Sequence, residues 1–565
     1  MTKTLIRREA TAATLSSDLP DLLNRLYANR GLTSGDDLDL ALKHLIPPTE
    51  LMGVPEAVDL LAASLDAGER LLVVGDFDCD GATSSALMVS VLRGMGADVR
   101  YLVPNRFEFG YGLTPEIVDV GLAFDPQLIV TVDNGISSIE GVRYAKERGM
   151  KVVVTDHHLP AAVLPAADAI VNPNQPGCAF ASKHLAGVGV AFYLLSALRG
   201  SLRRRNWFEA NGVAEPNLAD RLDLVSLGTV ADVVPLDRNN RVLVHEGLRR
   251  IRAGRALPGI YALISVAGKD ARFLNSVDMA FALAPRLNAA GRLEDMSLGI
   301  NCLLEDKPDK AREMAGRLNE LNVSRREIEQ DMKAQAEASL AKIEAVDAMA
   351  IGIALYEPDW HQGVVGIVAS RIKDRFNRPV FAFAPGDAGE LKGSGRSIAG
   401  LHIRDALDAI AARYQGLVIK FGGHAMAAGL SIREADFPAF RDAFDEEARR
   451  WLSSDDLEAS VLSDGELDCR VDVPLARQVL EGGPWGQGFP PPVFDGRFEI
   501  LSQKIVGGRH LKLKARLEKT DQVFDAIAFG NDRLIENRHC SLVFRLDVNI
   551  YDGLMTVQLI VDEVD

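Results

Sequence analysis

The chain has 565 residues, too many for one ordinary hydrophobic core, so several domains are expected. With 47% hydrophobic and 25% charged residues, its composition is typical of a globular protein. The net charge of −16 argues against a protein held on nucleic acid by bulk electrostatics, although a local basic groove would suffice. Five scattered cysteines and no apolar signal core at the N-terminus predict a cytoplasmic protein with no membrane segment.

Residues 1–50 are predicted to form a mostly helical N-terminal extension that ends at Pro47-Pro48. From about residue 51 to 240, strand and helix patterns alternate, and an apolar run near Gly187–Leu198 predicts a buried helix. This alternation is typical of βαβ units on a parallel sheet, which places its sites beyond the carboxyl ends of the strands. The predicted strands are Leu71–Val74, Val99–Val103, Leu128–Val132, Lys151–Thr155 and Ala169–Val171.

An acidic stretch follows the first of these strands. Asp76, Asp78 and Asp80 occupy alternate positions, and in an extended segment their carboxylates would lie on one side. Such carboxylates repel one another unless a cation lies among them, and a hard divalent ion is the simplest candidate. A solvated acidic turn is the alternative. Alternation points Cys79 away from the carboxylates, as a small buried side chain.

Two further strands also end in metal-ligand residue types. Asp133 follows one strand, and Asp156, His157 and His158 follow another. Asp232 lies in an uncharged run after an apolar segment. Taken singly, each aspartate could belong to a turn or a helix cap. Taken together, the carboxylates and imidazoles favour a pair of Mg²⁺ or Mn²⁺ ions, and such pairs hydrolyse phosphate esters.

These motifs resemble those of a known family. Asp76–Gly81, Asp133–Gly135, Asp156–His158 and Gly228–Asp232 are similar, in this order, to the motifs of the DHH phosphoesterase superfamily. Gly422–Gly429 resembles the glycine-rich motif of the associated DHHA1 domain. From about residue 50 onward the chain is most similar to the RecJ family of single-strand-specific exonucleases. The resemblance implies an α/β fold: a parallel-sheet DHH domain, a long connecting helix, a second α/β (DHHA1) domain and a C-terminal OB-like β-barrel.

The resemblance also implies residue roles. Two divalent ions, Mn²⁺ or Mg²⁺, would be shared by Asp78, Asp80, Asp133, His157 and Asp232, with Asp133 bridging them. Asp76 and His158 would support these ligands or orient water, and His424 would donate to the scissile phosphate. The residues implied to contact DNA phosphates are Arg286, Asn288, Arg292, Ser394, Arg396, Gly422, Gly423 and His424. Without the resemblance, surface arginines, helix caps and a core histidine would explain these residues as well.

The second half of the chain begins with a helical composition. Residues 306–347 are expected to form one long connecting helix, although a surface helix of one domain is the alternative. In the DHHA1 region, a helix opening at His361 has glycines that would let a phosphate approach its backbone N–H groups. The expected segments are an extension at 1–50, DHH at 51–305, the connector at 306–347, DHHA1 at 348–450 and the OB-like domain at 455–565.

The last domain is predicted from several short strands, with a hairpin turn at Asp552-Gly553. His510–Leu517 alternates strictly, which places Lys512, Lys514 and Arg516 on one face. This face would suit a DNA strand, with a solvated strand face as the alternative.

The resemblance implies a 5′→3′ exonuclease that releases mononucleotides from single-stranded DNA in recombination and repair. It also implies a monomer that works with a single-stranded-DNA-binding protein and a RecQ-type helicase. The alternatives are a DHH phosphodiesterase of short oligonucleotides or cyclic dinucleotides, and a catalytically inactive DHH scaffold in replication.

Overall fold

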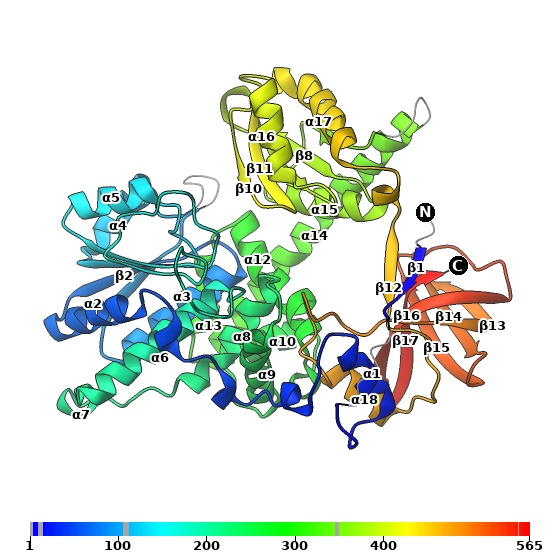
Figure 1. The fold of residues 1–565 in the computed structure, drawn as a ribbon, viewed down its shortest axis with the longest axis horizontal. Helices are drawn as coiled ribbons and strands as arrows, with labels where there is room; N and C mark the ends of the chain where they lie inside the picture. The colour runs from blue at the N-terminus through cyan, green and yellow to red at the C-terminus, as the bar shows by residue number, and fades with distance from the viewer. Residues whose placement is uncertain (1–3, 10–14, 106–111, 345–349, 552, 565) are drawn as a thin grey trace. The chain divides into compact units, whose positions relative to one another are not determined.

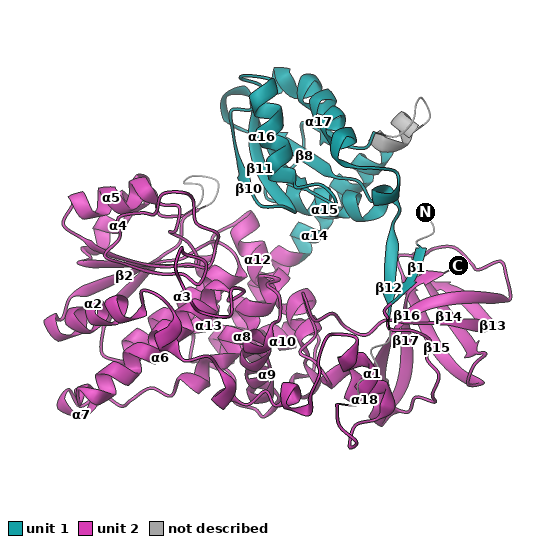
Figure 2. Cartoon of the chain, viewed as in Figure 1, with its two compact units in different colours: residues 1–7, 323–463, 565 teal, residues 8–322, 464–564 magenta. Residues whose placement is uncertain are grey.

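The structure is a computed structural model that describes residues 4–9, 15–105, 112–344, 350–551 and 553–564. The chain forms two compact units, shown in different colours in Figure 2. The larger comprises residues 8–322 and 464–564, and the smaller comprises residues 323–463 with the N-terminal segment 1–7. Over the described residues, no helix combines the length and the apolar character needed to cross a bilayer.

A five-stranded parallel sheet organises the larger unit. Its order is β3 (Asp98–Leu102), β2 (Arg70–Val74), β4 (Leu128–Val132), β5 (Lys151–Thr155) and β6 (Ala169–Val171). These strands confirm the predicted ones to within a residue at each end. Because the chain runs from β2 to β3 and then returns to the other side of β2, the connections change direction between β2 and β4. Ligands bind at such a switch point in open α/β sheets.

Strand residues alternate between two apolar layers. Leu71 and Val73 face one layer and Leu72 and Val74 the other, as the period of two requires. Figure 1 shows the two layers of helices on either side of the sheet. The first layer contains α2 (Val54–Ala67), α3 (Cys79–Gly94) and α6 (Gly187–Arg204), and the second contains α4 (Pro115–Gly121) and α5 (Ile139–Glu147). The buried helix predicted near Gly187–Leu198 is confirmed as α6.

The prediction that the acidic stretch is extended through Asp80 is wrong. Asp78 is the N-cap of α3, where its Oδ1 accepts a hydrogen bond from the N–H of Gly81 at 3.0 Å, and Asp80 lies in the first helical turn. An aspartate at the N-cap satisfies one of the free N–H groups of a helix start, and this local gain favours the helix over an extended chain. Cys79 is buried, as expected, but as the first residue of this helix.

A helical region follows the sheet in the larger unit. Arg286, Asn288 and Arg292 lie on the helix α12, which directly follows the π-helical turn η7. The elements are α7 (Trp207–Ala210), α8 (Leu222–Ala231), α9 (Arg238–Arg252), α10 (Pro258–Val266), α11 (Ser276–Asp278), η7 (Met279–Leu283), α12 (Ala284–Leu293) and α13 (Ser297–Leu304).

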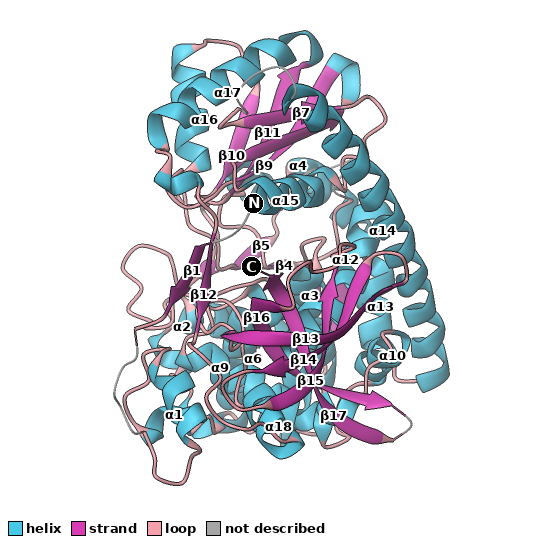
Figure 3. Ribbon diagram, turned by 90° about the vertical axis from the view of Figure 1, so that its right-hand side faces the viewer, coloured by secondary structure: helices cyan, strands magenta, loops and turns pink. Residues whose placement is uncertain are grey.

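The larger unit also contains the predicted C-terminal barrel, which is closed in the strand order β13-β14-β15-β17-β16 (Figure 3). The first strand of the barrel was not predicted from the sequence. Asp552 of the expected hairpin turn lies outside the described residues. The strands are β13 (Phe494–Val506), β14 (His510–Leu517), β15 (Gln522–Phe529), β16 (His539–Tyr551) and β17 (Leu554–Val564).

The N-terminal extension is less helical than expected, because its described residues include the strand β1 and long irregular stretches. Its helical parts, among these residues, are α1 (Asp21–Ala28) and the short 3₁₀ turns η1 (Gly35–Leu38), η2 (Leu42–His44) and η3 (Pro48–Glu50). Tyr27 of α1 stacks on Trp485, which lies between α18 (Val473–Glu481) and the barrel strands. The extension is therefore anchored to the entry of the barrel.

The smaller unit has its own five-stranded sheet. Helix α14 (Pro308–Glu344) carries the chain into this unit and confirms the predicted long helix. A separate two-stranded sheet in this unit pairs β1 (Thr4–Arg7) in parallel with β12 (Ser460–Ser463). The order of the five-stranded sheet is β10 (Lys420–Gly423), β11 (Ala427–Arg433), β9 (Glu390–Arg396), β8 (Val380–Pro385) and β7 (Ile353–Tyr356), and the helices on its faces are α15 (Val365–Phe376), α16 (Ile403–Arg413) and α17 (Phe437–Trp451).

Candidate metal centre

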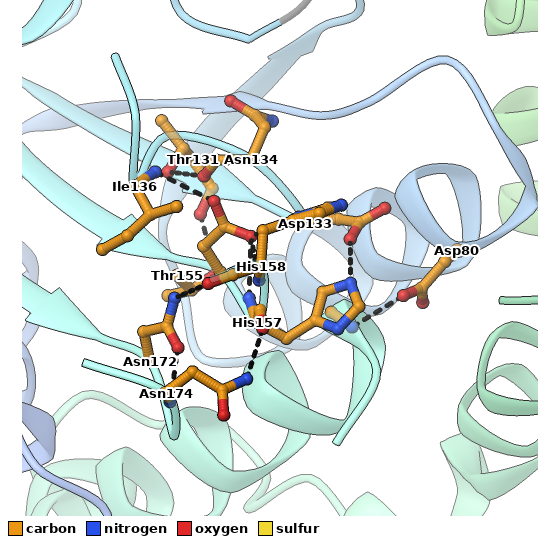
Figure 4. A network of polar contacts seen from close by, with 12 residues as sticks. Asp80, Thr131, Asp133, Asn134, Ile136, Thr155, His157, His158, Asn172 and Asn174 are labelled. Carbon is orange, nitrogen blue, oxygen red and sulfur yellow. Dashed lines mark hydrogen bonds and ion pairs between the residues drawn. The ribbon is translucent and has the colours of Figure 1, made fainter. Parts of the chain in front are cut away.

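Acidic and imidazole side chains meet at the switch point of the parallel sheet. Asp76, Asp78 and Asp133 bring carboxylate oxygens within 4.8 Å of one another. Asp80, His157 and Asp232 form a second group within the same limit. The two groups are joined because Nε2 of His157 lies 3.1 Å from Oδ1 of Asp133 and 3.4 Å from Oδ2 of Asp232. Figure 4 shows His157 pointing toward Asp133.

The structure thus brings together all seven residues predicted around the metal site, including His158, which forms a further group with Asp133 and His157. Asp232 is the C-cap of α8, and Asp133 has a left-handed backbone with φ of 62°. Asp76 was expected beside the ligands, but its oxygen lies as close to Asp78 and Asp133 as a ligand would.

Burial and mutual repulsion shift the pKa values of these groups. Burial, and then repulsion by the negative charge of Asp232, raise the pKa of Asp80 to about 7. Burial, with the charge of Asp78 added, raises the pKa of Asp232 to about 8. The pKa of Asp133 is raised well above its usual range by burial and then by Asp80 and Asp78, and burial lowers the pKa of His157. Such shifts are typical of a site that lacks a compensating positive charge.

Two residues are fixed by hydrogen bonds to the backbone. Asp80 accepts from the N–H groups of Gly187 at 2.6 Å and Val188 at 3.0 Å, at the positive N-terminal end of α6. Asp156 accepts from the N–H groups of Ile136, His157 and His158 at 2.7 to 3.1 Å. The two carboxylates therefore have fixed orientations.

Asp156 also binds the ring of His158, with 2.7 Å between Oδ1 and Nδ1. Burial by itself lowers the pKa of His158, but the hydrogen bond and the charge of Asp156 outweigh it and raise the pKa to about 9. Asp156 therefore favours the protonated ring of His158, which can donate a hydrogen bond to an anion.

The donor set fits divalent metal ions. It combines carboxylate oxygens with the buried Nε2 of His157, which makes no hydrogen bond to any described group although it faces two carboxylates. Carboxylates with an imidazole suit Mn²⁺, and carboxylates alone suit Mg²⁺. The cluster could hold two such ions that share Asp133.

Three asparagines at this edge of the sheet have roles that the sequence did not predict, although Asn134 belongs to the Asp133–Gly135 motif. Asn134 donates to the carbonyl oxygens of Val74 and Val132 and so ties β2 to β4. Asn172 and Asn174 donate to the carbonyl oxygens of His158 and His157, respectively. Because Asn172 directly follows β6, the rule that sites lie beyond strand ends could have found it.

The predicted phosphate contacts of α12 have protein partners. Arg286 is buried, and its guanidinium donates to Oδ1 of Asn319 at 3.0 Å and to the carbonyl oxygen of Ala282. Oδ1 of Asn288 accepts from the N–H of Cys79 at 2.7 Å. Arg292 is half-buried near the end of the same helix. A phosphate role for these residues remains a prediction.

The smaller unit brings its predicted residues together on three adjacent strands. Ser394 of β9 pairs with Gly429 of β11, which pairs with Gly422 of β10, and His424 directly follows β10. Arg396 donates to Oγ of Ser394 at 3.1 Å. These residues share one region of the sheet.

Helix α15 begins at Val365 and not at His361 as expected. A Cβ on Gly366 would lie 2.9 Å from Oγ of Ser394 and 3.1 Å from Nη2 of Arg396. This glycine therefore lets the helix approach Ser394 and Arg396 of β9, and a phosphate at the N–H groups of this helix stays a prediction.

The barrel confirms the alternation predicted for β14. Leu511, Leu513, Ala515 and Leu517 are buried, whereas the predicted DNA-binding residues alternate with them. Lys512 and Lys514 are exposed, and Arg516 is half-buried and paired with Glu499 at 3.0 Å. The two lysines are thus the more accessible cations of this face.

Comparison with known proteins agrees with this arrangement. The DHH family, N-terminal domain, matches residues 70–229, the DHHA1 domain matches 345–450 and the RecJ OB domain matches 463–563. The chain is 52% identical to proteins called single-stranded-DNA-specific exonuclease RecJ from Salmonella typhimurium and Escherichia coli, over 99% of this chain and 98% of each relative.

Solved structures extend the similarity to the fold. The crystal structure of RecJ in complex with Mn²⁺ from Thermus thermophilus matches with a TM-score of 0.79 and 32% identity, covering 100% of this chain and 79% of that one. The Mg²⁺ complex from the same organism matches with a TM-score of 0.73 and 30% identity, covering 99% of this chain and 78% of that one. The chain belongs to the RecJ family of single-stranded-DNA-specific exonucleases.

Proposed function

We propose that this chain is a metal-dependent exonuclease that hydrolyses terminal phosphodiester bonds of single-stranded DNA from the 5′ end and releases mononucleotides, in DNA recombination and repair. The observation that carries the proposal is the joined pair of ligand groups around Asp133, at the switch point of the sheet. The names of relatives that are 52% identical over nearly the whole chain support the substrate and the reaction.

Asp78, Asp80, Asp133, His157 and Asp232 would hold two ions, Mn²⁺ or Mg²⁺, with Asp133 between them. The closeness of the ligand atoms in both groups supports this assignment, and Asp76 is positioned to join the first group. When bound, such ions lower the pKa of a bound water and neutralise charge on the phosphoryl oxygens.

The remaining site residues would act on the substrate directly. His158, kept protonated by Asp156, is suited to donate to a phosphoryl oxygen. Arg292, and the group of Ser394, Arg396, Gly422, Gly423 and His424 in the smaller unit, would bind phosphates. Lys512 and Lys514 of β14 would contact the DNA strand farther from the reaction, as basic faces of OB domains do.

The proposed cellular setting rests on the family and on the cysteines. The resemblance to RecJ supports action with a single-stranded-DNA-binding protein and a RecQ-type helicase, and action as a monomer. The five free cysteines, three of them buried, support a reducing cytoplasm.

The test is digestion of single strands labelled at either end, with Mn²⁺, with Mg²⁺ and with EDTA. We expect metal-dependent release of labelled mononucleotides from the 5′-labelled strand. The 3′-labelled strand should lose its label slowly, and blunt duplex should be cleaved little. Cleavage confined to the shortest oligonucleotides, or no cleavage with either ion, would refute the proposal.

A further inference from the structure

One hydrogen bond links helix α12 to residues 77–80, the end of the loop after β2 together with the first residues of α3, which carry Asp78 and Asp80. Oδ1 of Asn288 accepts from the backbone N–H of Cys79 at 2.7 Å. Cys79 is the first residue of α3 and lies between the two aspartates. The first N–H groups of a helix have no acceptor within the helix, so a partner from elsewhere is required when they are buried.

Two of the first N–H groups of α3 have side-chain acceptors, one from the N-cap and one from another helix. Asp78 caps the N–H of Gly81 from within the loop. Asn288 caps the N–H of Cys79 from another element. An amide oxygen can do this without charge, whereas a carboxylate at the same place would add to the repulsion that already raises the pKa of Asp80.

Close packing surrounds this hydrogen bond. One turn after Asn288, a Cβ on Gly291 would overlap the carbonyl oxygen of Phe77, so only glycine lets the backbone of α12 touch this loop. Leu287, Ala289 and Ala290, the neighbours of Asn288 in α12, are also buried. The loop is therefore held at Phe77 by packing and at Cys79 by a hydrogen bond, on either side of Asp78.

We propose that Asn288 is a positioning residue of the metal centre, which fixes Asp78 and Asp80 by accepting the N–H of Cys79. This replaces the role expected from the sequence, in which Asn288 donates to a substrate phosphate. The inference rests on the proposed function in taking this loop to hold the catalytic ions. Groups that orient metal ligands contribute about 10- to 100-fold to metal affinity.

The experiment measures the Kd of Mn²⁺ by titration calorimetry on the EDTA-stripped full chain, with the EPR spectrum of bound Mn²⁺ as a second readout. Asn288→Leu removes the acceptor at similar volume, and we expect the Kd to rise at least about tenfold. Asn288→Asp keeps the acceptor but removes the NH₂ donor, and we expect Mn²⁺ to bind no more weakly than to the unmodified protein.

If Asn288→Leu fails to fold, the comparison of Asn288→Gln with Asn288→Asp keeps the test decisive. Asn288→Gln keeps the donor but displaces the acceptor by one methylene, so we expect weaker Mn²⁺ binding than in Asn288→Asp. If Asn288 instead donated to a substrate phosphate, Asn288→Asp would bind DNA in EDTA more weakly than Asn288→Gln and would be the most impaired variant. The Kd of Mn²⁺ would then be unchanged in all variants. That result would overturn the proposal.

Asn217→Leu is the matched control, because Asn217 likewise accepts a backbone N–H, that of Ala219, at the start of the helical turn η5 (Leu218–Arg221). Its Kd for Mn²⁺ should not change, and an equal loss in both leucine variants would overturn the positioning role. If the unmodified protein binds Mn²⁺ but cuts no DNA, the proposed function fails while the role of Asn288 in the metal loop stands.

Discussion

Nε2 of His157 lies 3.1 Å from Oδ1 of Asp133, although the two residues follow different strands, β5 and β4. Asp133 also forms one ligand group with Asp76 and Asp78, so its carboxylate belongs to that group and contacts the other group through His157. A carboxylate in this position, between two groups of ligands, is suited to hold two ions together.

Replacing Asp133 with asparagine should remove cleavage while the protein still folds. The change keeps the shape of the side chain but removes a buried negative charge, so repulsion with Asp80 and Asp78 falls. We expect cleavage of single-stranded DNA to fall by about 10⁴-fold, as for essential catalytic groups, and the melting temperature of the EDTA-treated protein to rise at pH 8. A variant that keeps a tenth of the activity would exclude Asp133 from the metal site.

Metal-free protein should lose stability as the pH rises from about 4 to 8. The pKa values of Asp80 and Asp232 in the folded state are about 7 and about 8, above the ordinary value of 3.8. Between these limits the folded state keeps protons that the unfolded state has released, so unfolding becomes easier as the pH rises. Bound Mn²⁺ should therefore raise the melting temperature more at pH 8 than at pH 5. Thermal unfolding in EDTA and in Mn²⁺ measures both effects, and an equal shift at the two pH values would contradict this account.

The basic face of β14 should contribute to DNA affinity. We expect Lys512→Gln with Lys514→Gln to weaken binding of a long single strand in EDTA. The slope of log K against log salt should become shallower by about 0.7 for each lysine that contacts a phosphate. Lys519→Gln is the control, since Lys519 is also exposed in the barrel but lies 3.5 Å from Glu466. Equal effects of the control and the double variant would assign the loss to net charge and not to this face.

The N-terminal extension should be held by a buried ion pair. Arg30 and Asp464 lie 3.0 Å apart with both side chains 1% exposed, and Asp464 also accepts from the N–H of Val493 at 3.1 Å. Removing one partner of such a pair leaves an unpaired buried charge, so Asp464→Ala should lower the free energy of unfolding by about 3–5 kcal/mol. Denaturant unfolding measures this change.

The neighbouring pair of Arg25 with Asp468 provides the control for that measurement. Its atoms lie 3.2 Å apart, but the side chains are 27% and 51% exposed. Asp468→Ala should therefore cost less than about 1 kcal/mol. If both alanine variants lose the same stability, burial of the Arg30 pair is not what anchors the extension.

Local pattern was sufficient for most of the fold. Apolar runs bounded by turn residues located the five parallel strands, and strict alternation located β14 with its two exposed lysines. The first barrel strand was missed because Phe494–Val506 passes from buried to exposed positions without a regular period. The acidic stretch was misjudged because alternate carboxylates satisfy both an extended chain and the N-cap of a helix.

The sequence by itself determined which residue types follow which strands, and parallel strands place their ends at one edge, so the set of candidate ligands could be found without coordinates. It could not decide how these ligands are divided, because the grouping of Asp80 with His157 and Asp232 depends on where α3, β5 and α8 end in space. Nor could it decide what Asn288 does. A side-chain amide can donate or accept, and only the packing of α12 against the start of α3 shows that its oxygen receives the N–H of Cys79.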